Sequence, residues 1–206
     1  MIAFDVSLKE ELGALGSATV YEAAGREGAL WRSFTSIDPA LALVGPAFLV
    51  SCPPGDNLAI HRAIALASPG DVLVVDAGGY AGAGHWGEIT TVAAQARGIA
   101  GVVIDGTVRD SRPILARGFP VFHRGLCIAA ATKKAPPAEP PTVLQFAGCT
   151  IRKGDMVVAD ADGIAIVPAE RVAEVVEAAR RRAADEQHTM TCLQDGQTTL
   201  ELFGWQ

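Results

Sequence analysis

Residues 70–110 read GDVLVVDAGGYAGAGHWGEITTVAAQARGIAGVVIDGTVRD, and this stretch decides the fold. GDVLVVDA (70–77) and GVVID (101–105) are short apolar runs, which is typical of strands buried on both faces. Between them, GEITTVAAQARG (87–98) has the pattern of a helix that ends at Gly98. A strand, a helix and a strand in this order predict parallel strands joined by a crossover helix.

The flanking sequence continues this alternation and then changes character. Before the stretch we expect a strand or strand pair over 40–52 and a helix over 57–67, and after it a short helix near 111–117 and a strand over 119–122. TKKAPPAEPPT (132–142) has four prolines in eleven residues, which predicts an extended connector. Beyond it we expect three consecutive antiparallel strands within 143–168 and a closing helix over 169–184. The chain is therefore predicted to be an α/β protein, with residues 1–206 forming a single domain.

The composition limits the partners. The net charge is −6 with no basic stripe, which argues against nucleic acid. Hydrophobic residues make up 50% of the chain and charged residues 19%, yet no window of 18 uncharged apolar residues marks a membrane span. Such an apolar chain is expected to bury surface against copies of itself. The four cysteines are far apart and the N-terminus lacks the pattern of a signal peptide, so a cytoplasmic location is expected.

One glycine-rich motif invites a nucleotide-binding hypothesis. Gly82, Gly84 and Gly87 spell GxGxxG, and Asp105 follows at the distance of a dinucleotide fingerprint. However, Gly82 does not follow the predicted strand directly, and the large neighbours His85 and Trp86 would crowd a pyrophosphate. A nucleotide-dependent enzyme is therefore one alternative, and a flexible loop over a pocket is the other.

Charged residues gather where the predicted parallel strands end. The carboxyl ends of such strands are where open α/β sheets bind ligands. The helix that opens at Gly87 would present free N–H groups to an anion, and Arg109 offers a planar fork to a carboxylate. Glu88 and Asp110 supply hard oxygen atoms suited to Mg²⁺ or Mn²⁺. The alternative is that Arg109 and Asp110 only cap the next helix or pair with neighbours.

The spacing of these residues resembles a known family. Twenty residues separate Glu88 from Arg109, giving E-x20-R-D, and with GDVLVVDAGG and AAQARGIAGVVIDGTVRD around it the chain resembles the class II pyruvate aldolases of the RraA-like family. This family includes 4-hydroxy-4-methyl-2-oxoglutarate and 4-carboxy-4-hydroxy-2-oxoadipate aldolases. The resemblance extends from about residue 56 to 124 and returns at GDMVVADADGIAIVP (154–168). It implies a swivelling β/β/α fold with one mainly parallel sheet, one antiparallel sheet and helices.

The resemblance also implies roles for the motif residues. Arg109 would hold the pyruvyl carboxylate and the enolate, Asp110 would be the one direct protein ligand of Mg²⁺ or Mn²⁺, and Glu88 would hold metal-bound water. The substrate would also meet the segment Gly87, Glu88, Ile89 and Thr90. The implied reaction is cleavage of a 4-hydroxy-2-oxo acid to pyruvate and a second carbonyl product, with oxaloacetate decarboxylation as a related activity. A non-catalytic regulator of ribonuclease activity on the same scaffold is the alternative, which the intact motif disfavours.

Further implications concern assembly and the remaining polar residues. The family forms trimers or paired trimers, so a homotrimer or homohexamer is expected. In relatives a carboxylate from the last helix of a neighbouring subunit approaches the metal waters, and Asp185 or Glu186 could fill that place. His85 could touch either substrate or solvent. Asp76 and Asp105 end predicted strands, where carboxylates most often bond nearby backbone N–H groups.

Overall fold

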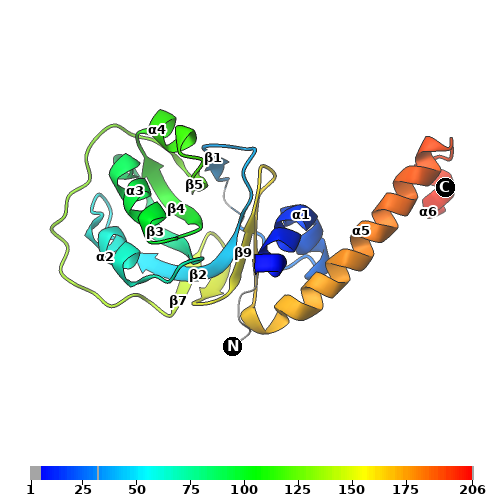
Figure 1. The fold of residues 1–206 in the computed structure, drawn as a ribbon, viewed down its shortest axis with the longest axis horizontal. Coiled ribbons are helices and arrows are strands. Elements are labelled where there is room, and N and C mark those ends of the chain that lie inside the picture. The colour runs from blue at the N-terminus through cyan, green and yellow to red at the C-terminus, as the bar shows by residue number, and fades with distance from the viewer. Residues whose placement is uncertain (1–5, 32, 206) are drawn as a thin grey trace.

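A large mixed sheet forms the centre of the protein, whose computed structural model describes residues 6–31 and 33–205 (Figure 1). The strand order is β1-β5-β4-β3-β2-β9-β10, and β6 also pairs with β4. The β2–β3, β3–β4, β4–β5 and β4–β6 pairs are parallel, as residues 70–110 predict, and the other three pairs are antiparallel. The strands of this sheet are β1 (Thr35–Ser36), β2 (Leu43–Ser51), β3 (Val72–Trp86), β4 (Gly101–Val108), β5 (Val121–His123), β6 (Gly125–Leu126), β9 (Met156–Ala159) and β10 (Ile164–Val167).

The predicted run of three antiparallel strands is instead two separate hairpins. Strands β7 (Val143–Phe146) and β8 (Cys149–Arg152) form a two-stranded sheet of their own, while β9 and β10 extend the large sheet beside β2. The change of direction occurs at Gly154, whose φ of 93° favours glycine. There the N–H of Gly154 donates to Ala47 O, and the N–H of Ala47 donates to Asp155 O. These two bonds draw the chain onto β2, so β9 pairs with β2 and not with β8.

Both faces of the parallel strands are buried, because successive side chains of a strand point to opposite faces. Leu73 and Val75 of β3 belong to the core beneath the helices, and Val72 and Val74 belong to the core beneath the β7–β8 hairpin. Figure 1 shows α2 (Leu58–Leu66), α3 (Glu88–Ala96) and α4 (Ser111–Ala116) on one side of the sheet. The result is the predicted class: a mixed α/β protein with a mainly parallel sheet, a separate antiparallel sheet and helices.

Strand β3 is longer than predicted and absorbs the glycine-rich segment. We expected a strand over 70–77 followed by a loop, but β3 continues to Trp86. The continuation is irregular, since Asp76 pairs with Asp105 and Trp86 with Val108, leaving more residues on β3 than on β4. The extra residues bulge outward, and 78–82 are exposed. The segment is therefore a bulged strand rather than a free loop.

The proline-rich connector is held at its first residues by a buried carboxylate. Residues 133–142 form no helix or strand, as predicted. The Oδ2 atom of Asp56 accepts hydrogen bonds from Thr132 Oγ1, the N–H of Lys134 and the N–H of Ala135, at 2.7, 2.6 and 3.2 Å. Burial opposes ionisation of Asp56, but these bonds and one from the N–H of Leu58 lower its pKa to about 2. The start of the connector is thus fixed beside the first turn of α2.

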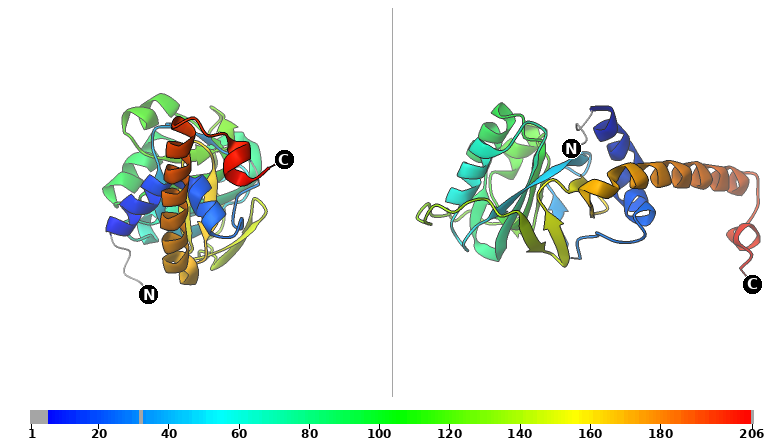
Figure 2. Two further views of the ribbon diagram at one scale, coloured as in Figure 1. Left: turned by 90° about the vertical axis from the view of Figure 1, so that its right-hand side faces the viewer. Right: turned by 90° about the horizontal axis from the view of Figure 1, so that it is seen from below.

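Two long helices, α1 (Val6–Ala23) and α5 (Val172–Gln194), lie at the far end of the sheet, and the outer part of α5 forms a long arm (Figure 1). Helix α1 is kinked at Gly16, where φ is 78° and ψ is 159°. Helix α5, which follows the short helix η1 (Ala169–Arg171), packs on α1 and the β9–β10 hairpin through its first turns. The rest of α5 runs away from the body and ends at α6 (Thr199–Phe203), as Figures 1 and 2 show. The predicted helix, 169–184, is therefore about ten residues too short.

The described part of the chain contains no helix that is both long enough and apolar enough to cross a membrane. Its four cysteines are all free thiols. The first five residues, which contribute to the prediction about targeting, lie outside the described part.

Candidate active site

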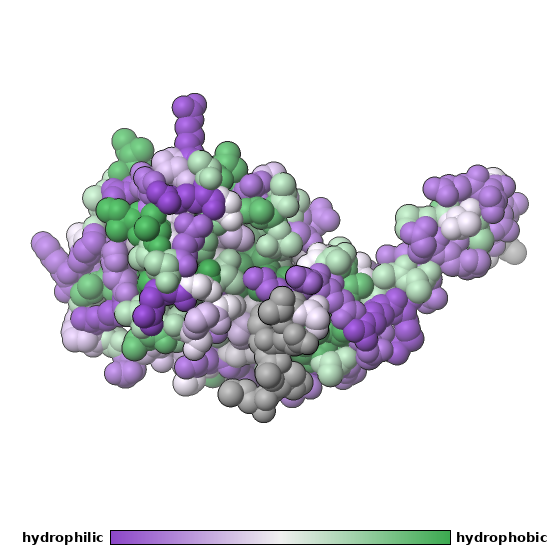
Figure 3. Space-filling model, in the orientation of Figure 1, coloured by the Kyte–Doolittle hydropathy of each residue, from purple (hydrophilic) through white to green (hydrophobic). Residues whose placement is uncertain are grey.

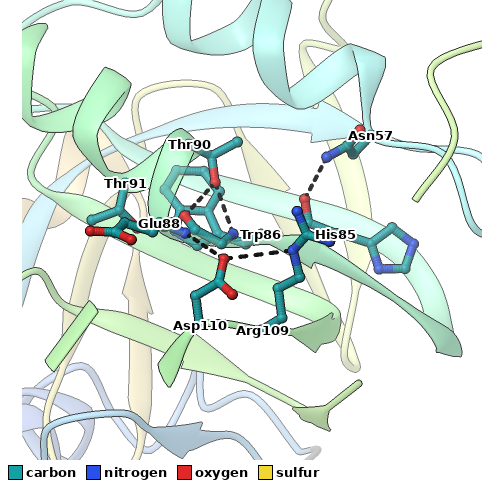
Figure 4. Close-up of polar contacts among 9 residues, drawn as sticks. Asn57, His85, Trp86, Glu88, Thr90, Thr91, Arg109 and Asp110 are labelled. Carbon is teal, nitrogen blue, oxygen red and sulfur yellow. Dashed lines mark hydrogen bonds and ion pairs between the residues drawn. The ribbon is translucent and has the colours of Figure 1, made fainter. Parts of the chain in front are cut away.

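Arg109 and Asp110 follow the end of β4 and lie against the start of α3 (Figure 4). The N–H of Arg109 donates to Trp86 O at 2.9 Å, which ties this segment to the end of β3. Asp110 has a left-handed backbone (φ 59°, ψ 38°), a conformation that Asp tolerates better than most residues. Its side chain does not cap its own helix, α4; Oδ2 instead accepts the N–H of Glu88 at 3.0 Å. The alternative in which Asp110 caps the following helix is therefore not what the structure contains.

The first turn of α3 is held in place by its own threonines. Thr90 Oγ1 accepts the N–H of Gly87 at 2.9 Å and also donates to Gly87 O at 2.8 Å. Thr91 Oγ1 donates to Gly87 O at 3.0 Å and accepts Trp86 Nε1 at 2.7 Å. These buried bonds fix the N-terminus of α3 beside Asp110, so the predicted substrate-binding segment adjoins the predicted metal ligand.

Two glycines lie where segments of the chain come close together around Arg109, and the backbone contact at Gly84 leaves no room for a side chain. A Cβ atom at Gly87 would lie 2.6 Å from Asp110 Oδ2, and one at Gly84 would lie 2.5 Å from Cys127 O and 3.1 Å from Arg109 Cβ. The first two distances are shorter than those that real Cβ atoms show, and the third is at the tight end of their range. Gly82 lies in the exposed bulge of β3, not in a turn that opens a helix. The close approach of neighbouring segments of the chain thus accounts for Gly84 and Gly87 without a nucleotide.

These residues border a cleft of about 110 Å³. Five of the six predicted site residues line it: Gly87, Ile89, Thr90, Arg109 and Asp110. The cleft is also lined by residues from the start of α2, from β3 and from the segment that leads into the connector: Asn57, His61, Gly84, His85, Trp86, Ala130, Ala131 and Lys133. A larger cavity of about 430 Å³ lies between α2 and the connector, but it contains none of the predicted site residues. The smaller cleft is the candidate active site because the charged motif lies there.

Arg109 brings positive charge to this cleft. Its Nε lies 3.6 Å from Asp110 Oδ2, and both side chains are a little over one third exposed. Lys133 adds a second cation, and its charge together with burial lowers the pKa of His61. Burial is the larger of the two causes. A cleft lined by an arginine, a lysine and one carboxylate suits an anionic ligand that shares its oxygen atoms with a metal ion.

Glu88 is the one predicted site residue whose side chain does not line the cleft. Its backbone N–H faces Asp110, but its carboxylate points away, as Figure 4 shows. Glu88 Oε1 accepts Arg117 Nη2 at 2.7 Å and Arg117 Nε at 3.2 Å. The implied role of Glu88 in holding metal-bound water therefore requires a different side-chain rotamer from the one in this structure.

Asn57, which the sequence did not suggest, supplies a buried polar atom to the cleft. Its Nδ2 donates to His85 O at 2.9 Å. Its Oδ1 is buried and accepts no hydrogen bond from any residue in the described part of the chain. An acceptor left in this way costs free energy unless a ligand or water donates to it. Asn57 Oδ1 is therefore a buried acceptor whose donor is not among the described residues, and its amide group is held at the edge of the cleft by the bond from Nδ2 to His85 O.

His85 is buried in β3 rather than exposed in a loop. Its Nε2 accepts the N–H of Gly55 at 3.2 Å, and its Nδ1 lies 3.4 Å from Thr107 O. Burial lowers the pKa of His85, which agrees with a neutral ring that carries its proton on Nδ1. Of the two expectations for this residue, contact with solvent is wrong, since the side chain is fully buried.

The other acidic residues lie outside the cleft. Asp76 Oδ1 accepts the N–H of Gly78 at 2.9 Å, as expected for a carboxylate at a strand end. Asp105 is buried, with Oδ1 3.6 Å from Arg124 Nε. Asp185 and Glu186 are exposed on the arm of α5, and Glu186 pairs with Arg182 at 3.0 Å. The two arm residues could reach a cleft only in another copy of the chain.

The donor set fits a hard cation held by a single protein carboxylate. Among the residues 6–31 and 33–205, no three His, Cys, Asp or Glu side chains are arranged to hold a metal. Mg²⁺ commonly takes one or two carboxylates and completes its shell with water and substrate oxygens. Asp110 is partly exposed at the cleft and only its Oδ2 atom is engaged in the contacts above. The residues present therefore fit Mg²⁺ or Mn²⁺ and do not fit a closed structural site.

The fold and the cleft together define a mixed α/β protein that presents an arginine and an aspartate at the carboxyl ends of parallel strands. The chain belongs to the Aldolase/RraA family, whose model matches residues 17–166.

Individual relatives agree with this assignment. The chain is 37% identical over 161 residues to a protein of Halalkalibacterium halodurans named "Putative 4-hydroxy-4-methyl-2-oxoglutarate aldolase". The alignment covers 78% of this chain and 76% of that protein. Among solved structures, an uncharacterized protein from Pseudomonas syringae matches with a TM-score of 0.84 and 30% identity over 96% of this chain and 97% of the other. RraAS2 of Streptomyces coelicolor, described as an unusual member of the RNase ES inhibitor RraA protein family, matches with a TM-score of 0.80 and 28% identity, covering 90% and 96%. These similarities confirm the predicted RraA-like, swivelling β/β/α fold.

Proposed function

We propose that the protein is a divalent-metal-dependent aldolase that cleaves a 4-hydroxy-2-oxo acid to pyruvate and a second carbonyl compound. The observation that carries the proposal is the juxtaposition of Arg109, Asp110 and the first turn of α3 around one cleft. An aspartate that neither caps its own helix nor belongs to a larger acidic cluster is available to a cation. The name of the Halalkalibacterium relative, which describes an aldolase, supports the same class of reaction.

The substrate's pyruvyl end would be bound by charge and by the helix terminus. The guanidinium of Arg109 can donate two parallel hydrogen bonds to a carboxylate. The first turn of α3 leaves backbone N–H groups without helical partners, and these favour an anion. The N–H of Glu88 already donates to Asp110 and that of Gly87 to Thr90 Oγ1, so the N–H groups of Ile89 and Thr90 would be the ones to bind the anion.

As the C3–C4 bond breaks, the C4 hydroxyl loses its proton to water and becomes the second carbonyl group, and the electron pair of the bond stays on the pyruvyl fragment as an enolate. The enolate then takes a proton from water at C3 to give pyruvate. Arg109 is placed to stabilise the negative charge that develops on the enolate oxygen. A cation held by Asp110 would supply Lewis-acid polarisation of the keto oxygen. Loss of CO₂ from oxaloacetate passes through the same enolate, so the same residues would serve that reaction.

We expect pyruvate release from one or more 4-hydroxy-2-oxo acids, or from oxaloacetate, that depends on a divalent ion. A site of one carboxylate plus water binds metal weakly, so EDTA should abolish turnover and added Mg²⁺ or Mn²⁺ should restore it. The measurement is coupled detection of pyruvate across a small panel of oxo acids, before and after chelation. Full activity after exhaustive chelation would remove the metal from the mechanism. No turnover on any oxo acid would favour the non-catalytic ribonuclease regulator.

We also expect the protein to form a trimer or hexamer. Figure 3 shows apolar side chains gathered over the region of α3 and α4, where Ile89 is 75% exposed. The arm ends in Leu200, Phe203 and Trp205, which are each about half exposed or more. A solvated helical arm with an apolar end gains little stability by itself, so a neighbouring copy is its expected partner. In such an assembly Asp185 or Glu186 would approach a neighbour's cleft.

Light scattering at micromolar concentration measures this assembly directly. A single species of 21.4 kDa would contradict the expectation. A Phe203→Ser, Trp205→Ser variant should shift the mass toward the monomer, whereas the conservative change Thr189→Ser on the same arm should leave it unchanged.

A further inference from the structure

The ion pair between Glu88 and Arg117 connects the candidate metal site to the far end of α4. We infer that Arg117 is a positioning residue that holds the Glu88 carboxylate out of the cation site, so that Arg117 and the cation compete for Glu88. This inference rests on the proposed function, because it concerns the cation beside Asp110. It assigns a role to a residue that lies outside the E-x20-R-D motif.

Helix α4 carries the two competing positions at its two ends. Asp110 precedes its first residue and Arg117 follows its last, and a helix of six residues is about 9 Å long. Glu88 contacts both ends: its N–H donates to Asp110 Oδ2, and its carboxylate accepts Arg117 Nη2 and Nε. The backbone of Glu88 is thus beside the cation site, while its side chain extends along α4 to the other end.

Arg117 is presented from a fixed backbone. Its N–H donates to Pro113 O at 3.2 Å and Ile114 O at 3.1 Å. Its carbonyl oxygen accepts Gln95 Nε2 at 3.1 Å, which ties the end of α4 to α3. Both guanidinium donors meet the same carboxylate oxygen, Oε1, so the grip on Glu88 is on one oxygen rather than two. The ion pair therefore leaves Oε2 of Glu88 without a bond to Arg117.

A change of rotamer alone would move the Glu88 carboxylate toward the cation. The first residue of α3 is already within hydrogen-bond distance of Asp110 through its backbone, so no chain movement is needed. The two side chains are about 40% exposed, and ion pairs with such exposure contribute little net stability. A cation bound at Asp110 can therefore attract Glu88 away from Arg117. Removing Arg117 should remove the competitor and make cation binding tighter.

The test is the affinity for Mn²⁺ alone, measured as free Mn²⁺ by electron paramagnetic resonance. Arg117→Gln should lower the Kd about two- to fivefold, the range expected from a partly exposed pair. Arg117→Lys keeps a positive charge at this position and should remain near the wild-type Kd. Arg112→Gln removes the same charge from an exposed position of α4 and should change the Kd little. Melting curves on each variant identify any that are misfolded.

The role of Glu88 is isolated by repeating the substitution in its absence. In a Glu88→Gln background, Arg117→Gln should no longer tighten Mn²⁺ binding. An unchanged or weaker affinity of Arg117→Gln would overturn the inference, as would an equal tightening with and without Glu88. If the wild-type protein binds no Mn²⁺ at millimolar concentration, the proposed metal-dependent function fails as well. If it binds Mn²⁺ but Arg117→Gln binds no tighter, only the inference about Arg117 fails.

Discussion

Asp110→Asn is expected to lower turnover of the oxo-acid substrate by at least about a hundredfold, since a catalytic metal supplies several kcal/mol and each ~1.4 kcal/mol is tenfold. The substitution keeps the shape of the side chain and removes the charge that would anchor the cation. Asparagine tolerates the left-handed backbone at this position, and its amide oxygen can still accept the N–H of Glu88. The fold should therefore survive, and excess Mg²⁺ should restore only part of the activity.

Kinetics and melting curves on the same preparations check this result. Asp162→Asn is a matched control, because Asp162 is exposed in the turn between β9 and β10 and is remote in sequence from the motif. The idea is wrong if Asp110→Asn melts at a lower temperature yet keeps its activity per folded molecule. That outcome would reduce Asp110 to a residue that holds the start of α3.

Arg109→Lys should reduce both kcat and kcat/KM by roughly a hundredfold, a loss of a few kcal/mol in the barrier. Lysine keeps the positive charge, but its ammonium group cannot form the two parallel hydrogen bonds that a guanidinium donates to a carboxylate. The contact with the enolate oxygen grows as the C3–C4 bond breaks, so its loss is felt in the transition state. The guanidinium of Arg109 lies beside Asp110, the proposed cation ligand, so the lost hydrogen bonds would be those to the part of the substrate that reacts.

Steady-state kinetics with saturating metal separate binding from catalysis. A rise in KM with kcat unchanged would show that Arg109 only binds the ground state. Arg97→Lys is the control, since Arg97 donates to Ala65 O at 3.0 Å on the outer surface and does not line the cleft. Its activity should remain at the wild-type level.

The central unit of the fold could be predicted because its signals are local. Residues 70–77, 87–98 and 101–105 each carry an apolar pattern that fits one kind of element, and the structure confirms all three. The extension of β3 to Trp86 had no such signal, because its glycines contribute no side chains and its pairing depends on β4. The last ten residues of α5 were missed for a related reason: the buried residues of this helix all lie before Ala184, so the sequence beyond it carries little apolar signal.

The candidate site divides in the same way. Arg109, Asp110 and Gly87 could be placed together because the carboxyl ends of adjacent parallel strands meet at one edge of a sheet. Asn57 and Lys133 could not, because the hydrogen bonds of Asp56 bring the connector to α2 across a long sequence separation. The ion pair between Glu88 and Arg117 could not be predicted either, because a glutamate side chain can reach several partners and only the folded chain shows which one is near.

The anchoring of the connector by Asp56 has a consequence for how this protein can change during evolution or engineering. Residues 132–135 are fixed by that carboxylate, and Lys133 among them lines the cleft. The segment that follows, 136–141, has no regular structure and does not line the cleft. Insertions, deletions or a grafted peptide within 136–141 would therefore alter the length of the connector while leaving Lys133 in place. The protein can thus accept new sequence on this side of the molecule without disturbing the chemistry beside it.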